Sequence, residues 1–239
     1  MNAAPSWCDQ LSENGFAITP GVLDSQQIKD LISSLESVQR GSFQRRGGIR
    51  NLLDVSETVR ELSGSPSIRL IVSMVLGEKA FPVRGILFDK TESANWKVPW
   101  HQDLTIAVAE KVETDGFGPW SVKAGVQHVR PPAFVLENML SVRIHLDDCP
   151  AENGALKVIP GSHRGGRLSE NEAAETGAAG PVVVCEAAAG DVVLMRPLLV
   201  HSSSASEQRG RRRVIHLDYA SVRLPGGLQW QHEPRFNGV

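Results

Sequence analysis

Hydrophobic and polar positions divide the chain into a helical first part and a β-rich remainder. Apolar residues recur at helical spacing within residues 24–35, directly after polar residues that commonly cap helices. Residues 54–62 show the same spacing. Residues 65–77 repeat it between a proline and a glycine, which suit the two ends of a helix. We therefore expect residues 1–80 to form a helical support whose apolar faces pack on a sheet.

Beyond this region, short apolar or alternating segments are separated by glycine and proline, a pattern typical of β-strands. The expected strands are residues 84–90, 140–147, 156–159, 182–186, 191–195, 198–201 and 213–219. In the second of these, one set of alternate residues is apolar: Leu140, Val142, Ile144 and Leu146. The other set is polar: Ser141, Arg143, His145 and Asp147. One face should therefore pack while the other carries chemistry, and residues 83–220 should form a double sheet or barrel.

Two segments interrupt this pattern and are candidates to cover a cleft. Residues 105–137 are long, irregular and rich in glycine and proline, which is typical of a functional insertion. We expect them to act as a lid or a substrate wall. Residues 41–53 include Arg45, Arg46 and Arg50 among glycines, which suits either a loop over a cleft or a solvated basic loop. All 239 residues are expected to form one domain.

Composition narrows the possible partners. The 25 basic and 27 acidic residues give a formal charge of −2, so the sequence has no electrostatic footprint for nucleic acid. No stretch approaches the roughly 20 apolar residues of a membrane span, and no signal peptide pattern is present. We expect a cytoplasmic protein that acts on a small molecule. The widely spaced Cys8, Cys149 and Cys185 favour neither a disulfide framework nor a zinc knuckle.

The strongest chemical signal is His101-Gln102-Asp103, followed much later by His201 and Arg212. In an extended segment, residues two apart project to the same side, so His101 and Asp103 can hold one metal ion together. Two imidazoles and one carboxylate can occupy one face of Fe(II), leaving its other positions open. His201 is the candidate third ligand because it ends an apolar run and has a basic residue eleven positions beyond it.

The His-x-Asp pattern occurs three times, so it does not identify the metal site by itself. The pair His216/Asp218 lies too close to the end of the chain to be followed by a second histidine and an arginine at the right spacing. The pair His145/Asp147 also precedes His201 and lies in an expected strand. On spacing alone, it remains an alternative to His101/Asp103.

The order of several short motifs resembles the phytanoyl-CoA dioxygenase family of Fe(II)- and 2-oxoglutarate-dependent oxygenases. These motifs are Asn14-Gly15-Phe16, Trp100-His101-Gln102-Asp103, Leu146-Asp147-Asp148, Glu152-Asn153-Gly154-Ala155-Leu156, Ile159-Pro160-Gly161-Ser162-His163, Gly190-Asp191-Val192 and His201-Ser202-Ser203, followed by Arg212. The resemblance covers most of the chain and implies a mainly β fold with flanking helices, a cupin-like double-stranded β-helix or jelly roll. Because the family's metal motif precedes the Asn-Gly and Pro-Gly-Ser-His segments, the resemblance favours His101/Asp103 over the other pairs.

The resemblance also implies roles for individual residues. The iron ligands would be His101, Asp103 and His201. Arg212 would bind the distal carboxylate of 2-oxoglutarate, helped by the hydroxyl of Ser203. Two further candidates to contact cosubstrate or substrate are Arg143 and Lys90, although Arg143 also suits an ion pair at a strand edge. Strand alternation places Arg211 and Arg213 on the face opposite Arg212.

The activity implied by the resemblance is hydroxylation of an unactivated C–H bond with O2, giving succinate and carbon dioxide as co-products. Related halogenases have a small residue where this chain has Asp103, so the carboxylate favours hydroxylation, with desaturation or ring closure as variants. Two alternatives use the same scaffold: a sensor that binds metal and 2-oxoglutarate without turnover, and a cupin-like metalloenzyme without cosubstrate. Arg212 argues against the second. Neither the substrate nor the oligomeric state follows from the fold.

Overall fold

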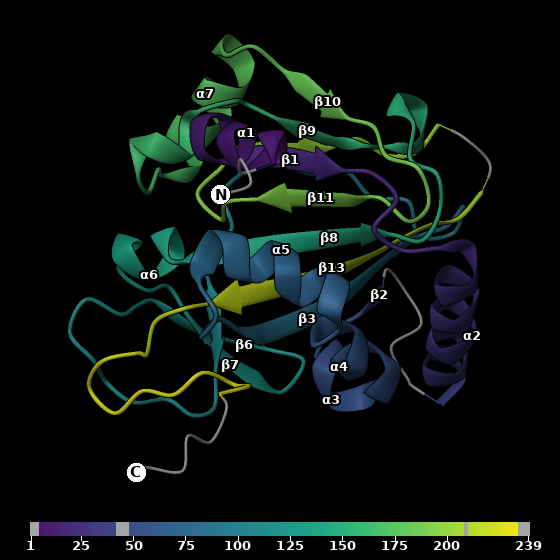
Figure 1. Cartoon of the computed structure of the whole chain (residues 1–239). Helices are drawn as coiled ribbons and strands as arrows, with labels where there is room; N and C mark the ends of the chain where they lie inside the picture. Colours follow the sequence, from purple (N-terminus) through teal and green to yellow (C-terminus); the bar gives the residue numbers. More distant parts are fainter. Residues whose placement is uncertain (1–4, 42–47, 208–209, 234–239) are drawn as a thin grey trace.

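Two facing antiparallel sheets form the centre of the molecule (Figure 1). The computed structural model describes residues 5–41, 48–207 and 210–233. The larger sheet has the order β1 (Phe16–Thr19), β11 (Val192–Met195), β8 (Met139–His145), β13 (Arg212–Ala220), β3 (Phe81–Lys90) and β2 (Gly48–Ile49). The smaller has the order β10 (Val183–Cys185), β9 (Leu156–Val158), β12 (His201–Ser203) and β4 (Val98–His101). The expected jelly roll with flanking helices is confirmed.

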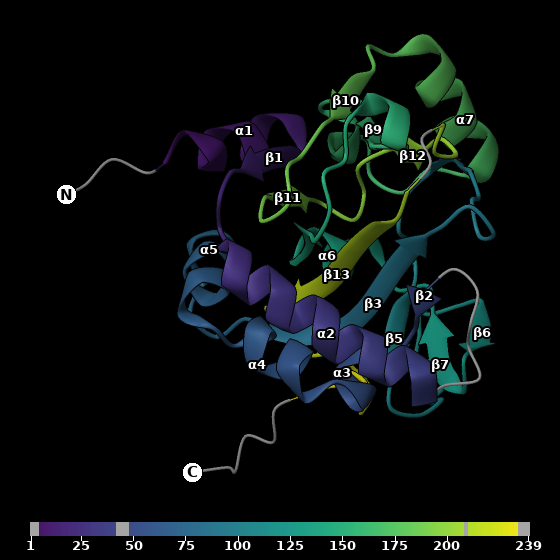
Figure 2. The same cartoon turned by 90° about the vertical axis from the view of Figure 1, so that its right-hand side faces the viewer.

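Helices cover the outer face of the larger sheet, as the periodicity of the first part predicts (Figures 1 and 2). They are α2 (Ser25–Gly41), α3 (Leu52–Val55), α4 (Glu57–Ser63) and α5 (Pro66–Leu76), while α1 (Ser6–Asn14) precedes β1 and α6 (Ala133–Glu137) precedes β8. The helix expected at 54–62 is divided at Ser56, whose hydroxyl accepts a hydrogen bond from the Val59 N–H and so caps α4. The first part also supplies two sheet strands, β1 and β2, which the helical pattern did not predict.

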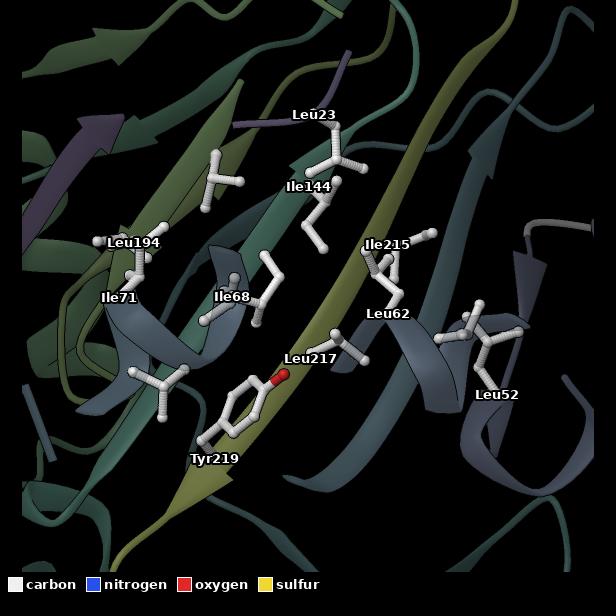
Figure 3. Close-up of a cluster of buried hydrophobic side chains, with 14 of the residues drawn as sticks. Leu23, Leu52, Leu62, Ile68, Ile71, Ile144, Leu194, Ile215, Leu217 and Tyr219 are labelled. Carbon is white, nitrogen blue, oxygen red and sulfur yellow. The ribbon is translucent and has the colours of Figure 1, made fainter. Parts of the chain in front are cut away.

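The main hydrophobic core lies between these helices and the larger sheet (Figure 3). Ile68 and Ile71 of α5 face Ile144 of β8 and Leu194 of β11, and all four are buried. The apolar set predicted for residues 140–147 belongs entirely to this cluster: Leu140, Val142, Ile144 and Leu146. The alternation is therefore confirmed within β8, whose opposite face lines the space between the sheets. The predicted polar set is wrong at Asp147, which lies beyond the end of the strand and pairs with Arg213.

The Tyr219 hydroxyl fastens β13 to the helical layer by donating a hydrogen bond of 2.9 Å to the Ser63 carbonyl. Replacing Tyr219 with Phe keeps the buried ring but removes this bond. We expect a loss of about 1–2 kcal/mol in the free energy of unfolding, measured by urea denaturation. Ser73→Ala is the control, because its hydroxyl bonds only within its own helix, and it should change stability by less than about 0.5 kcal/mol. Equal effects would contradict the assignment.

The strand expected at residues 198–201 is wrong. Leu199 N–H donates to the Arg196 carbonyl in a turn, and β12 begins only at His201. Leu198, Leu199 and Val200 are all buried, but each belongs to a different hydrophobic cluster. The three consecutive apolar residues are therefore explained by burial against three different parts of the core. They do not indicate an extended strand.

Residues 105–137 are also more regular than expected. They contain β5 (Ile106–Val108), β6 (Trp120–Lys123) and β7 (Val126–Val129), which form a separate sheet in the order β5-β7-β6. The alanine-rich stretch after residue 169 is the helix α7 (Glu170–Ala179), with a capping box between Ser169 and Glu172. Short 3-10 helices lie at Ala151–Asn153 and Ser162–Gly165. None of the described helices has the length and hydrophobicity needed to cross a membrane.

Candidate metal centre

Antiparallel pairing of two short strands brings the candidate metal ligands together. His101 at the end of β4 lies directly opposite His201 at the start of β12, and their ring centroids are 4.1 Å apart. Asp103 follows β4, where its N–H donates to the Pro197 carbonyl. One Asp103 carboxylate oxygen lies 3.9 Å from His101 Nε2, and the other lies 3.7 Å from His201 Nε2.

Backbone carbonyls orient both imidazole rings toward the centre. The Nδ1 atoms of His101 and His201 lie 2.8 Å from the carbonyl oxygens of Pro99 and Leu199, respectively. Each Nδ1–H therefore donates outward, which leaves the Nε2 lone pairs directed at Asp103, the arrangement expected of metal-binding histidines.

The protonation states of the cluster also suit a metal ion. Burial lowers the pKa of His201 to about 4, so its ring is neutral near pH 7. Burial opposes ionisation of Asp103, but the charge that His201 acquires in acid, together with the charge of Arg84, outweighs burial and lowers the pKa of Asp103 to about 2. Neutral imidazole and ionised carboxylate are the forms that bind metal.

His101, Asp103 and His201 offer three ligand atoms within 4.8 Å of one another. In the parts of the chain that the structure describes, this is the single cluster of three or more such groups. Two imidazole nitrogens and one carboxylate oxygen match the facial arrangement that binds non-heme Fe(II) with positions left open for other ligands.

The rival His145/Asp147 pair does not form a metal site. Asp147 lies beyond the end of β8 and makes an ion pair of 2.6 Å with Arg213 on the outer side. His145 stays buried on the inner side, and its ring nitrogens make no hydrogen bond to any described residue. The two side chains therefore point away from a common centre.

Gln102, between two of the candidate ligands, anchors their segment to the neighbouring loops. Its amide nitrogen donates to the carbonyls of Gly166 and Leu198, at 2.8 and 2.6 Å, and its amide oxygen accepts from Leu168 N–H. Both polar atoms of this buried side chain are thus hydrogen-bonded, which fixes the backbone that carries His101 and Asp103. No pattern in the sequence predicted this role for Gln102.

Two basic side chains, Arg212 and Lys90, form a basic wall beside the metal cluster. Arg212 and Lys90 lie opposite each other where β13 and β3 pair. Arg212 donates to the Gly154 carbonyl, and Lys90 donates to the Ser204 carbonyl and, at 3.4 Å, to Ser203 Oγ. Burial, followed by repulsion from Arg212, lowers the pKa of Lys90 to about 8. Three of the predicted cosubstrate contacts thus lie together beside the triad.

Arg143 lines the same cavity but is not part of a strand-edge ion pair. Its guanidinium donates to His216 Nδ1 at 3.0 Å and lies 5.4 Å from the centre of the Phe88 ring. Since Nδ1 of His216 accepts, its Nε2–H donates to Asp218, 2.9 Å away. Asp218 in turn accepts from Arg84 at 2.6 Å. A buried polar chain therefore runs along the inner face of β13.

The His216/Asp218 pair was predicted not to be the metal site, and it does not belong to the His-Asp-His cluster. The missed signal is the alternation of β13, which places Arg212, His216 and Asp218 on one face. Arg211 and Arg213 point the other way, as predicted, and pair with Asp89 and Asp147. The three consecutive arginines are thereby separated into one that faces the cavity and two that face outward.

The cavity around these groups has a volume of about 240 Å³. It extends from Arg212 past the triad to Thr105, Lys123 and Arg50. Asp103 is the single acidic residue among its described lining residues. The candidate loop at residues 41–53 contributes Arg50, while Arg45 and Arg46 lie outside the described residues. The arrangement can hold a metal ion beside one or more anionic ligands.

Fold and site together define a jelly-roll protein with a His-Asp-His cluster that lines its cavity. The family model for phytanoyl-CoA dioxygenase matches residues 11–214, so the chain belongs to the phytanoyl-CoA dioxygenase family. The resemblance stated from the motifs is thus confirmed. No protein in the curated set matches the chain.

Several solved structures share the fold. AviO1 from Streptomyces viridochromogenes Tue57 is 23% identical, with a TM-score of 0.68 over 92% of this chain and 96% of AviO1. The epimerase SnoN from nogalamycin biosynthesis, in complex with Fe3+, α-ketoglutarate and nogalamycin RO, is 19% identical, with a TM-score of 0.70 over 98% and 90%. HygX from Streptomyces hygroscopicus, with nickel and 2-oxoglutarate bound, is 19% identical, with a TM-score of 0.68 over 91% and 87%.

Proposed function

We propose that this protein is an Fe(II)- and 2-oxoglutarate-dependent dioxygenase that hydroxylates an unactivated C–H bond of a small metabolite, with succinate and carbon dioxide as co-products. The observation that carries the proposal is the convergence of His101, Asp103 and His201 beside a buried basic wall. Iron and 2-oxoglutarate, when bound with O2, would supply the oxidising chemistry.

The residues present fit both absent groups. The His-Asp-His set is the donor set for Fe(II). Arg212 and Arg143 both line the cavity, and the Nε atom of each is buried without a hydrogen-bond partner among the described residues. A dicarboxylate would satisfy such groups. The bound ligands of SnoN and HygX support the same pairing of metal and 2-oxoglutarate on this fold.

In this proposal, each group of the chain has a distinct task. His101, Asp103 and His201 hold the metal, with ring orientations fixed by backbone carbonyls. Arg212, with Lys90 and Ser203, binds the distal carboxylate of 2-oxoglutarate. The side chains of Trp96 and Leu156 add apolar surface to the cavity, which limits access of water to the reacting centre.

An anaerobic titration separates this function from its alternatives. Fe(II) and 2-oxoglutarate should give a metal-to-ligand charge-transfer band, which should decay in air as succinate forms. A coloured complex that is stable in air would instead support a sensor. Activity that does not depend on 2-oxoglutarate would support a cupin-like metalloenzyme. The product of a responsive substrate distinguishes hydroxylation from epimerisation, the reaction named for SnoN.

Replacing Arg212 with Met should weaken 2-oxoglutarate binding about ten- to a hundredfold, because hydrogen bonds to a charged group each contribute about 1.5–3 kcal/mol. Metal affinity should not change. The measurement is a titration of the anaerobic Fe(II) protein with 2-oxoglutarate. Arg213→Met is the matched control, since Arg213 faces outward and pairs with Asp147. If both variants bound 2-oxoglutarate as tightly as the original protein, the role of Arg212 would be wrong.

A further inference from the structure

We propose that the primary substrate carries an oxyanion group, a carboxylate or a phosphoryl group, that binds between Lys123 and Arg50 at the end of the cavity away from Arg212. This inference rests on the proposed function and deepens it by naming the substrate class. It also gives residues 105–137 a role in substrate recognition, through Lys123.

Lys123 is held close to the metal-binding segment. It ends β6, and its ammonium donates a hydrogen bond of 3.0 Å to Oγ1 of Thr105, two residues beyond Asp103. Lys123, Thr105 and Arg50 line the same cavity. Lys123 is partly buried while Arg50 is exposed, so the two cations suit the inner and outer sides of one anionic group.

This place is separate from the one assigned to 2-oxoglutarate. Arg212 and Asp218 are six residues apart on β13, which corresponds to about 20 Å at ~3.3 Å per residue. Arg84, opposite Asp218, also contacts the Thr105 carbonyl at 3.3 Å. Thr105 and Lys123 therefore lie near the far end of the inner face, with the metal cluster between them and Arg212.

The charge of the cavity is not balanced by its own acids. Asp103 is the single acid among the described lining residues, and the neighbouring Asp218 is already paired with Arg84. The charges of Asp103 and of the 2-oxoglutarate dianion would be matched by Fe(II) together with Arg212. Lys90 and Arg143 add further positive charge, with a carbonyl and an imidazole as their hydrogen-bond partners. At the other end of the cavity, Lys123 and Arg50 have no described acidic partner in an ion pair, so a substrate anion there would offset part of this excess positive charge.

The electrostatic environment of Lys123 agrees with this view. Burial lowers the pKa of its ammonium, and repulsion from Arg84 and Arg50 lowers it further, with Asp103 opposing them. Positive potential thus accumulates where a substrate would enter.

The cavity volume of about 240 Å³ falls below the ~300–1,000 Å³ typical of ligand sites. A compact substrate, or the compact end of a larger one, fits this space beside 2-oxoglutarate.

The test is calorimetric titration of the full chain loaded with Ni(II) and 2-oxoglutarate, using acetate and methylphosphonate as separate probes. Loading with 2-oxoglutarate fills the Arg212 side first. At least one probe should bind, and Lys123→Met and Arg50→Gln should each weaken that binding at least tenfold. Lys123→Arg should restore most of it. Lys29→Gln, an exposed lysine on α2, is the matched control and should not change it. The probe that binds tells a carboxylate from a phosphoryl substrate.

Other outcomes overturn one proposal or the other. If 2-oxoglutarate binds but neither probe does, or if a probe binds equally to the Lys123→Met and Arg50→Gln variants, the anion subsite is wrong while the oxygenase assignment stands. If the original protein binds no 2-oxoglutarate in the presence of metal, the proposed function itself fails. Retained 2-oxoglutarate binding in each variant shows that the substitution left the folded site intact.

Discussion

Replacing Asp103 with Ala is expected to abolish metal-dependent succinate formation. The substitution removes one of three ligand atoms and the only acidic group among the described lining residues. Since loss of an outer partner of a ligand already costs about 10- to 100-fold in affinity or activity, loss of the ligand itself should cost more. The measurements are Fe(II) affinity under anaerobic conditions and succinate release in air.

The chain provides a matched control for this variant in its own rival motif. Asp147→Ala changes the same residue type in the same His-x-Asp context, but its carboxylate pairs outward with Arg213. Metal affinity and succinate formation should therefore remain close to those of the original protein. Undiminished turnover in the Asp103 variant, or loss of metal in the Asp147 variant alone, would overturn the assignment of the triad.

Replacing Asp218 with Asn should have the largest effect on stability. The Asp218 carboxylate is buried and accepts hydrogen bonds from Arg84, His216 and Ser141. The neutral amide would remove the ion-pair partner of the largely buried Arg84. Removal of one member of a buried pair typically costs about 3–5 kcal/mol. Urea denaturation at pH 7 measures the loss, with 2-oxoglutarate binding as a check on the site.

The double variant Arg84→Met, Asp218→Leu provides the control, because it removes both charges together. It should be less destabilised than the sum of the losses in the single variants Arg84→Met and Asp218→Leu. Strict additivity would show that the pair does not interact.

The same carboxylate makes stability depend on pH. Burial opposes its ionisation, but Arg84 and His216 outweigh burial and hold the pKa of Asp218 well below its usual range. A depressed folded pKa gives stability that is present above the unfolded pKa of about 3.9 and is lost as pH falls below it. The difference in stability between the original protein and Asp218→Asn should therefore shrink below about pH 4.

The sequence predicted best those features that depend on strict alternation. In residues 140–147, the apolar residues alternate with polar ones, so β8 and its packed face followed from period two. Alternation also separated Arg212 from Arg211 and Arg213, while the direction of Arg212 toward the site came from the family resemblance. The metal cluster was predictable for a related reason, because His101 and Asp103 are two residues apart. The choice of this pair over His145/Asp147 required the order of the family motifs.

Prediction failed where burial does not follow one face. Leu198, Leu199 and Val200 enter three separate clusters, so their hydrophobicity indicates no period. The contribution of Lys123 to the cavity depends on how a separate sheet folds back beside Asp103, which no local pattern encodes. Gln102 was missed because its partners lie 64, 66 and 96 positions away in the chain.

The separate three-stranded sheet has a consequence for how this scaffold can be altered. The strands β5, β6 and β7 form a sheet of their own, with one isolated bridge from Val108 to Trp230, whereas His101 and His201 lie on strands of the smaller main sheet. Residues 105–137 could therefore be exchanged for those of another family member without cutting a main-sheet ladder. The Lys123 side of the proposed substrate site would then move with one contiguous segment of the gene, while Arg50 would stay with the scaffold.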